Sequence, residues 1–517
     1  MEINRDKLPI SRWRVLLLVF ALSWLAVLCW WHRRVAMDDA WITFHYAQRL
    51  ASGEGLAFNP GERLEGFSNL SWVLLSVPAM VANLDPLGWA RILSMGCSAV
   101  LVGLLVMGWR RHEDAGPMGR TAVGGLALAG AVPLGVWTMG GLETALQCVL
   151  LLVYTLGLSM LLGRACGRGA AVACAAAMGL MVTRPEGFAF GLLLAVGLVR
   201  PGARLAAFHA LAAFLVCLAF YTTWRFLYFG TIVANTVTAK VGGGLAQRVV
   251  DGVVYTGAFF DGPLIVVLAL AGWAAISRFG SLVRPTRWAE DEALVLAAGL
   301  VAGMHVCFAI AVGGDWMPGG RFLVPAVAPL CVMMGVAVRR WPFFVRAVLV
   351  IFLLLGGLVD GRTDPELRWY RWAGRESGGL VTYPLREAGR WLADNAHPAD
   401  LVAGSEAGVI PYFSRHRFLD MVGLVDAHLA RVPGAMHEKV DADYVLSREP
   451  DWIVVNVRRI DGREVAPWPT DAAVMAHPEF EEHYVEAKRF PRLVNGPEWS
   501  LEPMELVIHQ RRREVRP

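Results

Sequence analysis

Two adjacent aspartates follow the first long apolar run of the chain and are its strongest candidates for chemistry. Asp38 and Asp39 come shortly after the apolar residues 15–31. Neighbouring side chains on a helix or strand point in different directions, so one carboxylate could act as a general base on a hydroxyl group while the other holds a metal or orients a basic residue. The competing interpretation is that they only begin a helix over 40–50, because aspartate is favoured at helix starts. Their place at the end of the apolar run favours a chemical role for one of them.

Three basic residues are suited to binding an anion. Arg184, Lys240 and Arg321 lie in short polar stretches between long apolar runs. Arginine presents a fork of donors that matches phosphate oxygens, and lysine presents a compact charge. Alternatively, each side chain could extend to lipid headgroups. Glycines beside Arg321 let the backbone approach a ligand closely, which favours a binding role for that residue.

Three further acidic residues lie in stretches of the same kind. Glu143, Glu186 and Asp315 could hold a cation or accept a hydrogen bond from a sugar, or each could pair with a nearby arginine. For Glu186, pairing with Arg184 is the expected outcome. The sequence shows no clear ligand set, so a divalent cation is possible but has no assigned residues. Aromatic residues in these stretches, including Trp316, are interpreted as members of the belt at the membrane surface, although sugar rings also stack on such side chains.

The composition is that of a membrane protein. Of the 517 residues 56% are hydrophobic, the mean hydropathy is +0.47, and the long apolar runs fall within residues 13–359. Since a membrane-spanning helix needs roughly 20 mostly apolar residues, about eleven spans are predicted. These are 13–31, 88–109, 121–139, 144–162, 169–183, 187–199, 205–224, 263–277, 292–312, 322–338 and 343–359. The apolar segment 68–84 is interpreted as a helix that lies at the interface or packs against the bundle.

The distribution of basic residues predicts the topology. With a cytoplasmic N-terminus, an uncleaved signal anchor over 15–31 and no span over 68–84, the Arg clusters fall in short inner loops, as the positive-inside rule requires. All eight candidate residues and the C-terminal region then lie outside. Because a carboxylate in hydrocarbon costs roughly 2.5–3.5 kcal/mol, such groups usually face a cavity or a partner, and one shared outer cavity is predicted. The net charge is only +4, and the Lys and Arg residues are not gathered on one face of the protein. Both observations argue against nucleic-acid binding.

The chain is predicted to have two domains. Residues 1–359 form the transmembrane domain with an outer loop over 32–87, and residues 360–517 form an extracytoplasmic α/β domain after a polar linker over 360–379. Within the second domain, 384–396 has helical spacing, with Leu385, Ala388 and Leu392 on one stripe. Short apolar runs predict strands at 401–403, 418–422, 452–455 and within 480–510.

The stretches that contain the candidate site residues resemble the motifs of a known family. The first outer loop, 38–75, is similar to that of polytopic GT-C glycosyltransferases, in particular the terminal arabinofuranosyltransferases of the mycobacterial cell wall and their relatives. Further motifs follow in the order that the family has: GGLET at 140–144, TRPEG at 183–187, NTVTAK at 235–240, GGDWMPGGRFLVP at 313–325 and GSEAGVIPYFSRHRFLDMVGLVD at 404–426.

The resemblance implies a sugar donor built on a polyprenyl phosphate and an acceptor bound between the membrane cavity and the C-terminal domain. It also implies a catalytic carboxylate at Asp38 or Asp39 and a donor-phosphate role for Arg321, which Lys240 and Arg184 could share. The resulting prediction is a glycosyltransferase of the bacterial inner membrane that transfers a sugar, preferably arabinofuranose, to a glycan, lipid-glycan or protein on the outer side.

Three alternatives stay open at this stage. The first is a hexosyltransferase of the same fold that uses mannose or galactose. The second is a flippase or transporter of a lipid-linked sugar, which should carry charged residues near the bilayer midplane and often an inverted repeat. The third is a scaffold whose C-terminal domain only binds glycan.

Overall fold

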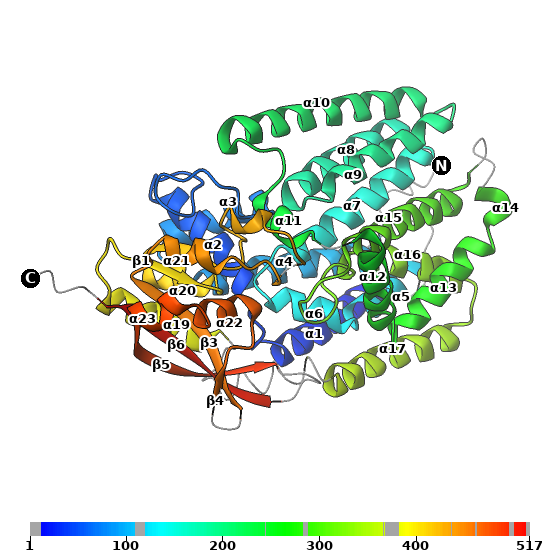
Figure 1. Cartoon of the computed structure of the whole chain (residues 1–517). Helices are drawn as coiled ribbons and strands as arrows, with labels where there is room; N and C mark the ends of the chain where they lie inside the picture. The colour runs from blue at the N-terminus through cyan, green and yellow to red at the C-terminus, as the bar shows by residue number, and fades with distance from the viewer. Residues whose placement is uncertain are drawn as a thin grey trace, which may run out of the picture.

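Long apolar helices form one side of the molecule and a mixed α/β region forms the other (Figure 1). The computed structural model describes residues 12–108, 119–242, 244–282, 288–364, 367, 382–435, 437–460, 463–495 and 501–512. A polytopic helical protein with a C-terminal α/β region was predicted, and this fold class is confirmed.

Seven helices in the described part of the chain are long and apolar enough to cross a membrane singly. They are α1 (Arg12–Trp31), α4 (Pro86–Met107), α7 (Thr144–Leu162), α8 (Cys166–Thr183), α10 (Arg204–Phe229), α15 (Glu290–Val312) and α17 (Phe343–Thr363). Each coincides with a predicted span. The helix α10 exposes Leu205, Phe220 and Leu227 by 70% or more, as expected of a helix that faces lipid.

Two further predicted spans are helix pairs with a sharp bend. The pair α5 (Arg120–Ala129) and α6 (Val132–Met139) bends by 59°, and the pair α12 (Leu245–Phe259) and α13 (Leu264–Ile276) bends by 103°. Pro133 and Pro263 stand at the two breaks, where the missing N–H and the ring interrupt the helix. Counting each pair as one span gives up to nine spans within the described residues.

The last two predicted spans are helical but shorter. Residues 187–199 form α9 (Gly187–Leu192) and the 3-10 helix η2 (Leu193–Val199), and residues 322–338 contain α16 (Val324–Val338). The segment 68–84 contains α3 (Leu70–Val81), which includes Pro78 and packs against α4, α8 and α2 (Asp38–Ala51). This agrees with the expected helix packed on the bundle.

The C-terminal region contains a six-stranded mixed sheet. The strands are β1 (Leu401–Gly404), β2 (Arg417–Asp420), β3 (Trp452–Ile460), β4 (Arg463–Val465), β5 (Tyr484–Asn495) and β6 (Leu501–Arg511). The order is β2-β1-β3-β6-β5, with β1 parallel to β2 and β3, β6 antiparallel to β3 and β5, and β4 paired with β3. The predicted helix is α19 (Tyr383–Asn395), with its expected stripe buried.

Two details of the C-terminal prediction need correction. The strand predicted over 418–422 ends at Asp420, because its side chain accepts hydrogen bonds from the backbone N–H groups of Val422 and Val425 and turns the chain. The short helices were not predicted; they are α20 (Val409–Ser414), η3 (Leu429–Arg431), α21 (Ala442–Ser447), α22 (Pro469–Met475) and α23 (Pro478–His483). The boundary at 359/360 stays a prediction. The helix α17 runs to Thr363, and linker residues 365–366 and 368–379 lie outside the described residues.

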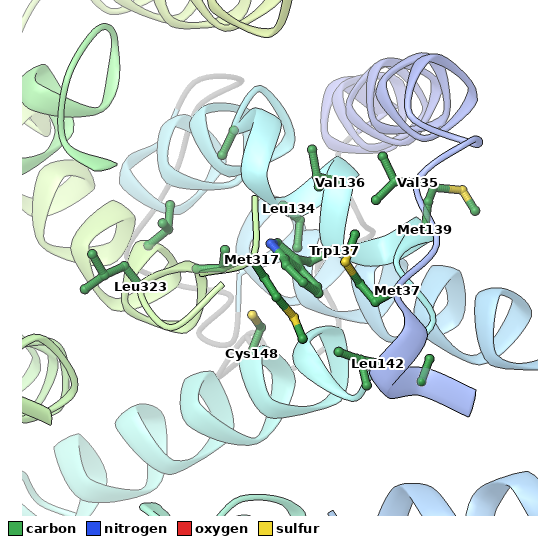
Figure 2. Packing of buried hydrophobic residues seen from close by; sticks show 14 of the residues in the cluster. Val35, Met37, Leu134, Val136, Trp137, Met139, Leu142, Cys148, Met317 and Leu323 are labelled. Carbon is green, nitrogen blue, oxygen red and sulfur yellow. The ribbon is translucent and has the colours of Figure 1, made fainter. Parts of the chain in front are cut away.

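One continuous apolar core joins the bundle to the α/β region. The ring of Trp41 on α2 lies 4.9 Å from those of Tyr412 and Phe413 on α20. In the same core, Met37, Leu142 and Met317 lie around Trp137, as Figure 2 shows. The Trp137 indole N–H donates to the carbonyl oxygen of Pro318 at 3.1 Å. The polar stretch 313–321 is therefore anchored on α6, at the junction of the two regions.

Candidate active site at the junction of the two regions

A cavity of about 350 Å³ that several charged side chains line lies where the helices meet the C-terminal region. Its walls come from the link between α8 and α9, from α11 (Asn235–Lys240), from α12, from residues 312–322 and from residues 435 and 437. Five of the eight predicted site residues line it: Arg184, Glu186, Lys240, Asp315 and Arg321. The motifs at 183–187, 235–240 and 313–325 thus meet in space although they are far apart in the chain.

Asp39 accepts a hydrogen bond from Lys240, which lines this cavity. The Lys240 ammonium donates to Asp39 Oδ2 at 2.9 Å, and the two side chains are 24% and 14% exposed. Burial raises the pKa of Asp39, but the nearby charges of Lys240 and Arg321 outweigh this and leave the pKa below its ordinary value. The carboxylate is therefore ionised at neutral pH and remains in partial contact with solvent, so it can accept a proton from a bound hydroxyl group.

Asp38 points in another direction and contacts the C-terminal region. Its two carboxyl oxygens accept hydrogen bonds from the backbone N–H groups of Gly408 and Val409 at 2.9 and 2.8 Å. A Cβ atom at position 408 would collide with the backbone oxygen of Asp38, so only glycine allows this close approach. Burial, and then the carboxylate of Glu406, raise the pKa of Asp38 to about 8, against the effect of the two N–H donors. Asp38 is therefore a joint between the regions.

Arg321 is the most deeply placed cation of the cavity. Its side chain is 5% exposed, and Nε lies 2.6 Å from Asp315 Oδ2 in an ion pair that lacks hydrogen-bond geometry. The guanidinium carbon lies 5.6 Å from the ring of Trp137 and 5.0 Å from that of Phe322. One carboxylate and two aromatic faces leave the forked end of Arg321 free to bind a further anion.

Arg184 is enclosed by acidic partners instead. It pairs with Glu143 at 2.9 Å and with Glu186 at 3.1 Å, and all three side chains are at most 8% exposed. Asn69 and Gln147 donate to these carboxylates at 2.7 and 2.8 Å. The expected pairing of Glu186 with Arg184 is present, and Glu143 joins it. Two carboxylates surround one guanidinium, so this network links α7 to the end of α8 and presents less positive charge to the cavity than Arg321 does.

The C-terminal region also fixes the helix that carries Lys240. The Asn235 amide donates to the carbonyl oxygens of Gly423 and Leu424 at 2.9 and 3.0 Å, and Lys439 donates to that of Thr238 at 2.9 Å. The motif at 235–240 therefore has two tasks. Its first residue binds the C-terminal region, and its last residue points to Asp39.

Three residues near the cavity were missed by the sequence analysis. Arg248 of α12 lines it, and Nε of its guanidinium is buried without a hydrogen bond. His437 lines it with a left-handed φ of 68°, and Glu406 lies close to Asp38 and His437. Non-glycine residues rarely adopt positive φ, and such strain is often found at functional sites. Arg248 lies in an amphipathic stretch with an ordinary charge pattern, so its sequence gives no signal. Glu406 lies in the quoted motif 404–426, which was the available signal.

Within the described residues no group of three or more His, Cys, Asp and Glu side chains is placed to hold a metal ion. The predicted divalent cation accordingly has no residues assigned to it and stays a prediction.

Comparisons with known proteins found similarity to glycosyltransferases. A terminal β-(1→2)-arabinofuranosyltransferase of Corynebacterium glutamicum is 26% identical over 369 residues, which cover 62% of this chain and 51% of that protein. The chain thus spans about half the length of this relative. A family model described as a domain of unknown function, DUF8728, matches residues 371–504, within the predicted C-terminal domain.

The crystal structure of ArnT from Cupriavidus metallidurans bound to undecaprenyl phosphate superposes with a TM-score of 0.55 and 14% identity, covering 96% of this chain and 98% of ArnT. The structure of its apo state gives the same TM-score with 15% identity. ArnT is a GT-C glycosyltransferase. The chain therefore has the GT-C fold, and the resemblance stated from its motifs is confirmed.

Proposed function

We propose that this protein is a membrane glycosyltransferase that takes a sugar from a polyprenyl-phosphate donor on the outer side of the membrane. The observation that carries the proposal is the Asp39 carboxylate, 2.9 Å from Lys240 beside the cavity that Arg321 also lines. An ionised carboxylate next to two cations, Lys240 and Arg321, is the arrangement that sugar transfer from a lipid phosphate needs. Arabinofuranose is the preferred sugar, supported by the 26% identical arabinofuranosyltransferase.

Binding of the donor follows from the charges. Lys240 and Arg321 hold the phosphate, with Arg248 as a further cation at the wall, while the apolar chain lies among the helices. Because Arg184 already has two acidic partners, it shapes the wall more than it binds the phosphate. The donor phosphodiester brings one negative charge, shared by its two non-bridging oxygens, to Lys240 and Arg321, each of which is ion-paired with one carboxylate.

Transfer needs one bond formed and one broken. An acceptor hydroxyl oxygen bonds to the anomeric carbon, and the bond from that carbon to the phosphate oxygen breaks. The electron pair leaves with polyprenyl phosphate, and Lys240 and Arg321 stabilise the charge that develops there. If the configuration inverts, Asp39 takes the hydroxyl proton in the same step. Asp38 is then a positioning residue, since both its oxygens are engaged with Gly408 and Val409.

The test is transfer by the purified protein in proteoliposomes. Polyprenyl-phosphate [14C]arabinofuranose is supplied, and released polyprenyl phosphate and labelled product are measured, with polyprenyl-phosphate mannose as a second donor. The expected result is release from the arabinosyl donor that D39N abolishes and D85N, a remote helix-capping aspartate, preserves. Label that crosses the bilayer but stays on the lipid would overturn the proposal in favour of a transporter. Faster release from the mannosyl donor would change the sugar assigned.

The outer orientation has a separate test. Single cysteines placed at Asp85 and at Gly202, in the links before α4 and before α10, are predicted to face opposite compartments. A membrane-impermeant thiol reagent should label D85C from outside whole cells and leave G202C unlabelled until the membrane is opened. The reverse pattern would place the cavity on the cytoplasmic side.

A further inference from the structure

Trp316 differs from the residues around it in the cavity wall. It lies beside the buried pair of Asp315 and Arg321, yet it is 48% exposed, whereas the Arg321 side chain is 5% exposed. The cavity therefore has buried cations on one part of its wall and an exposed indole on another.

The indole is fixed by contacts with the C-terminal region. Its ring lies 5.9 Å from that of His437 at an interplanar angle of 87°, and His437 stacks on Trp468 at 6.1 Å and 29°. Trp316 comes from the membrane part, whereas His437 and Trp468 come from the C-terminal part. A belt tryptophan faces lipid at the membrane surface, but Trp316 lines the cavity that holds Arg321 and contacts the C-terminal region. The belt interpretation given from the sequence does not fit this placement.

An exposed and fixed indole beside polar groups suits a saccharide. The face of an aromatic ring carries the negative part of its quadrupole, which attracts the polarised C–H groups of a sugar ring, while nearby polar side chains bind the hydroxyl groups. Burial lowers the pKa of His437 below its ordinary value, so its ring is neutral at pH 7 and can accept a hydrogen bond from a hydroxyl group. His437 also keeps a strained left-handed φ of 68°, as residues at binding sites often do.

We propose that Trp316, held by His437 and Trp468, is a stacking platform for a sugar ring of the acceptor, so that the acceptor is a carbohydrate and not a polypeptide. The identification of the bound saccharide as the acceptor rests on the proposed function. Binding of a saccharide to the platform can nevertheless be measured without catalysis. The platform and the phosphate-binding cations line one cavity, which brings an acceptor hydroxyl group to the donor sugar.

The experiment measures saccharide binding to the full chain in nanodiscs by saturation-transfer NMR and calorimetry. The probes are a synthetic arabinofuranosyl disaccharide, a mannosyl disaccharide and, as a third arm, a serine- and threonine-containing peptide. The variants are W316A, W316F and H437N, with W273A as the matched control. Trp273 is 60% exposed on α13, away from the cavity lining. Asparagine tolerates positive φ, so H437N removes the ring and keeps the backbone.

We expect that at least one of the two disaccharides binds the wild type and that W316A weakens its affinity by about three- to tenfold. This factor corresponds to the free energy of one aromatic contact. W316F should retain most of the affinity, H437N should lose less than W316A, and W273A should match the wild type. Peptide binding, no saccharide binding, or W316A with wild-type affinity would overturn the inference. If saccharide binding depends on Trp316 but no polyprenyl phosphate is released in the transfer assay, the inference is supported and the proposed function is contradicted. Release of polyprenyl phosphate without saccharide binding would support the proposed function and contradict the inference.

Discussion

Asp38 and Asp39 are neighbours in the first turn of α2, but their side chains contact two different regions of the molecule. Asp38 accepts two backbone hydrogen bonds from the C-terminal region, whereas Asp39 accepts one hydrogen bond from Lys240 beside the cavity. Their surroundings also push their pKa values apart, to about 8 for Asp38 and below the ordinary value for Asp39. Such a separation assigns different tasks to two carboxyl groups. The comparison supports the proposal that Asp39 is the general base, while Asp38 joins the two regions.

The largest effect is expected at Asp39. The D39N variant keeps the shape of the side chain and removes the proton acceptor, so release of polyprenyl phosphate should fall by about 10²- to 10⁴-fold. The thermal midpoint should stay near that of the wild type, because the side chain retains an oxygen for Lys240. Initial rates at saturating donor measure this, and D85N is the control. Near wild-type rates in D39N would transfer the catalytic role to Asp38.

The next effect is expected at Arg321. Replacing a donor that stabilises developing charge costs about 10²- to 10³-fold in rate, so R321A should lose that much. Removing the guanidinium also leaves Asp315 buried without its partner, so the folded fraction has to be measured alongside. R321K keeps the charge and loses the fork, and should fold with an intermediate rate. If folded R321K matched the wild type, the fork would have no role in phosphate binding.

A smaller effect on rate and a larger one on stability are expected at Asp38. D38A leaves two backbone N–H groups without acceptors, which costs about 1–3 kcal/mol. The two regions are then less well aligned, and the rate should fall by about tenfold to a hundredfold. Thermal unfolding in detergent and initial rates measure both. A rate loss in D38A as large as that of D39N, with unchanged stability, would break the distinction between the two residues.

The last prediction concerns stability and not rate, and it is a dependence of stability on pH. The folded-state pKa of Asp38 is about 8, above the unfolded value near 3.8, so the folded protein keeps a proton that the unfolded chain releases. The contribution of this group to stability is therefore lost as pH rises from about 4 to about 8. The thermal midpoint of the wild type should fall over that window, and that of D38N should fall less. Parallel curves for the two proteins would contradict the raised pKa.

The sequence is sufficient to predict what depends on composition and local order. All eleven predicted spans are helical because apolar runs of that length have few other conformations in a membrane, and the stripe of Leu385, Ala388 and Leu392 locates α19. The order of the motifs identified the GT-C fold. Bends such as the 103° between α12 and α13 depend on neighbouring helices as well as on Pro263, and the span count stayed approximate for that reason.

The pairings in the site could not be predicted because they join distant residues. Lys240 lies 201 residues beyond Asp39, and Gly408 lies 370 beyond Asp38, so the spacing carries no information about these contacts. Two adjacent aspartates look equivalent in the sequence, and only the fold places a backbone N–H pair against one and an ammonium group against the other. Arg248 and His437 have no local pattern that separates them from surface residues.

A cryo-EM map of the protein with a non-hydrolysable polyprenyl-phosphate sugar analogue tests the central claim most directly. The account predicts the phosphate between Lys240 and Arg321, with the anomeric carbon toward Asp39 and with Asp38 still bound to Gly408 and Val409. A phosphate outside this cavity, or an anomeric carbon that faces Asp38 after the bonds to Gly408 and Val409 have opened, would contradict it.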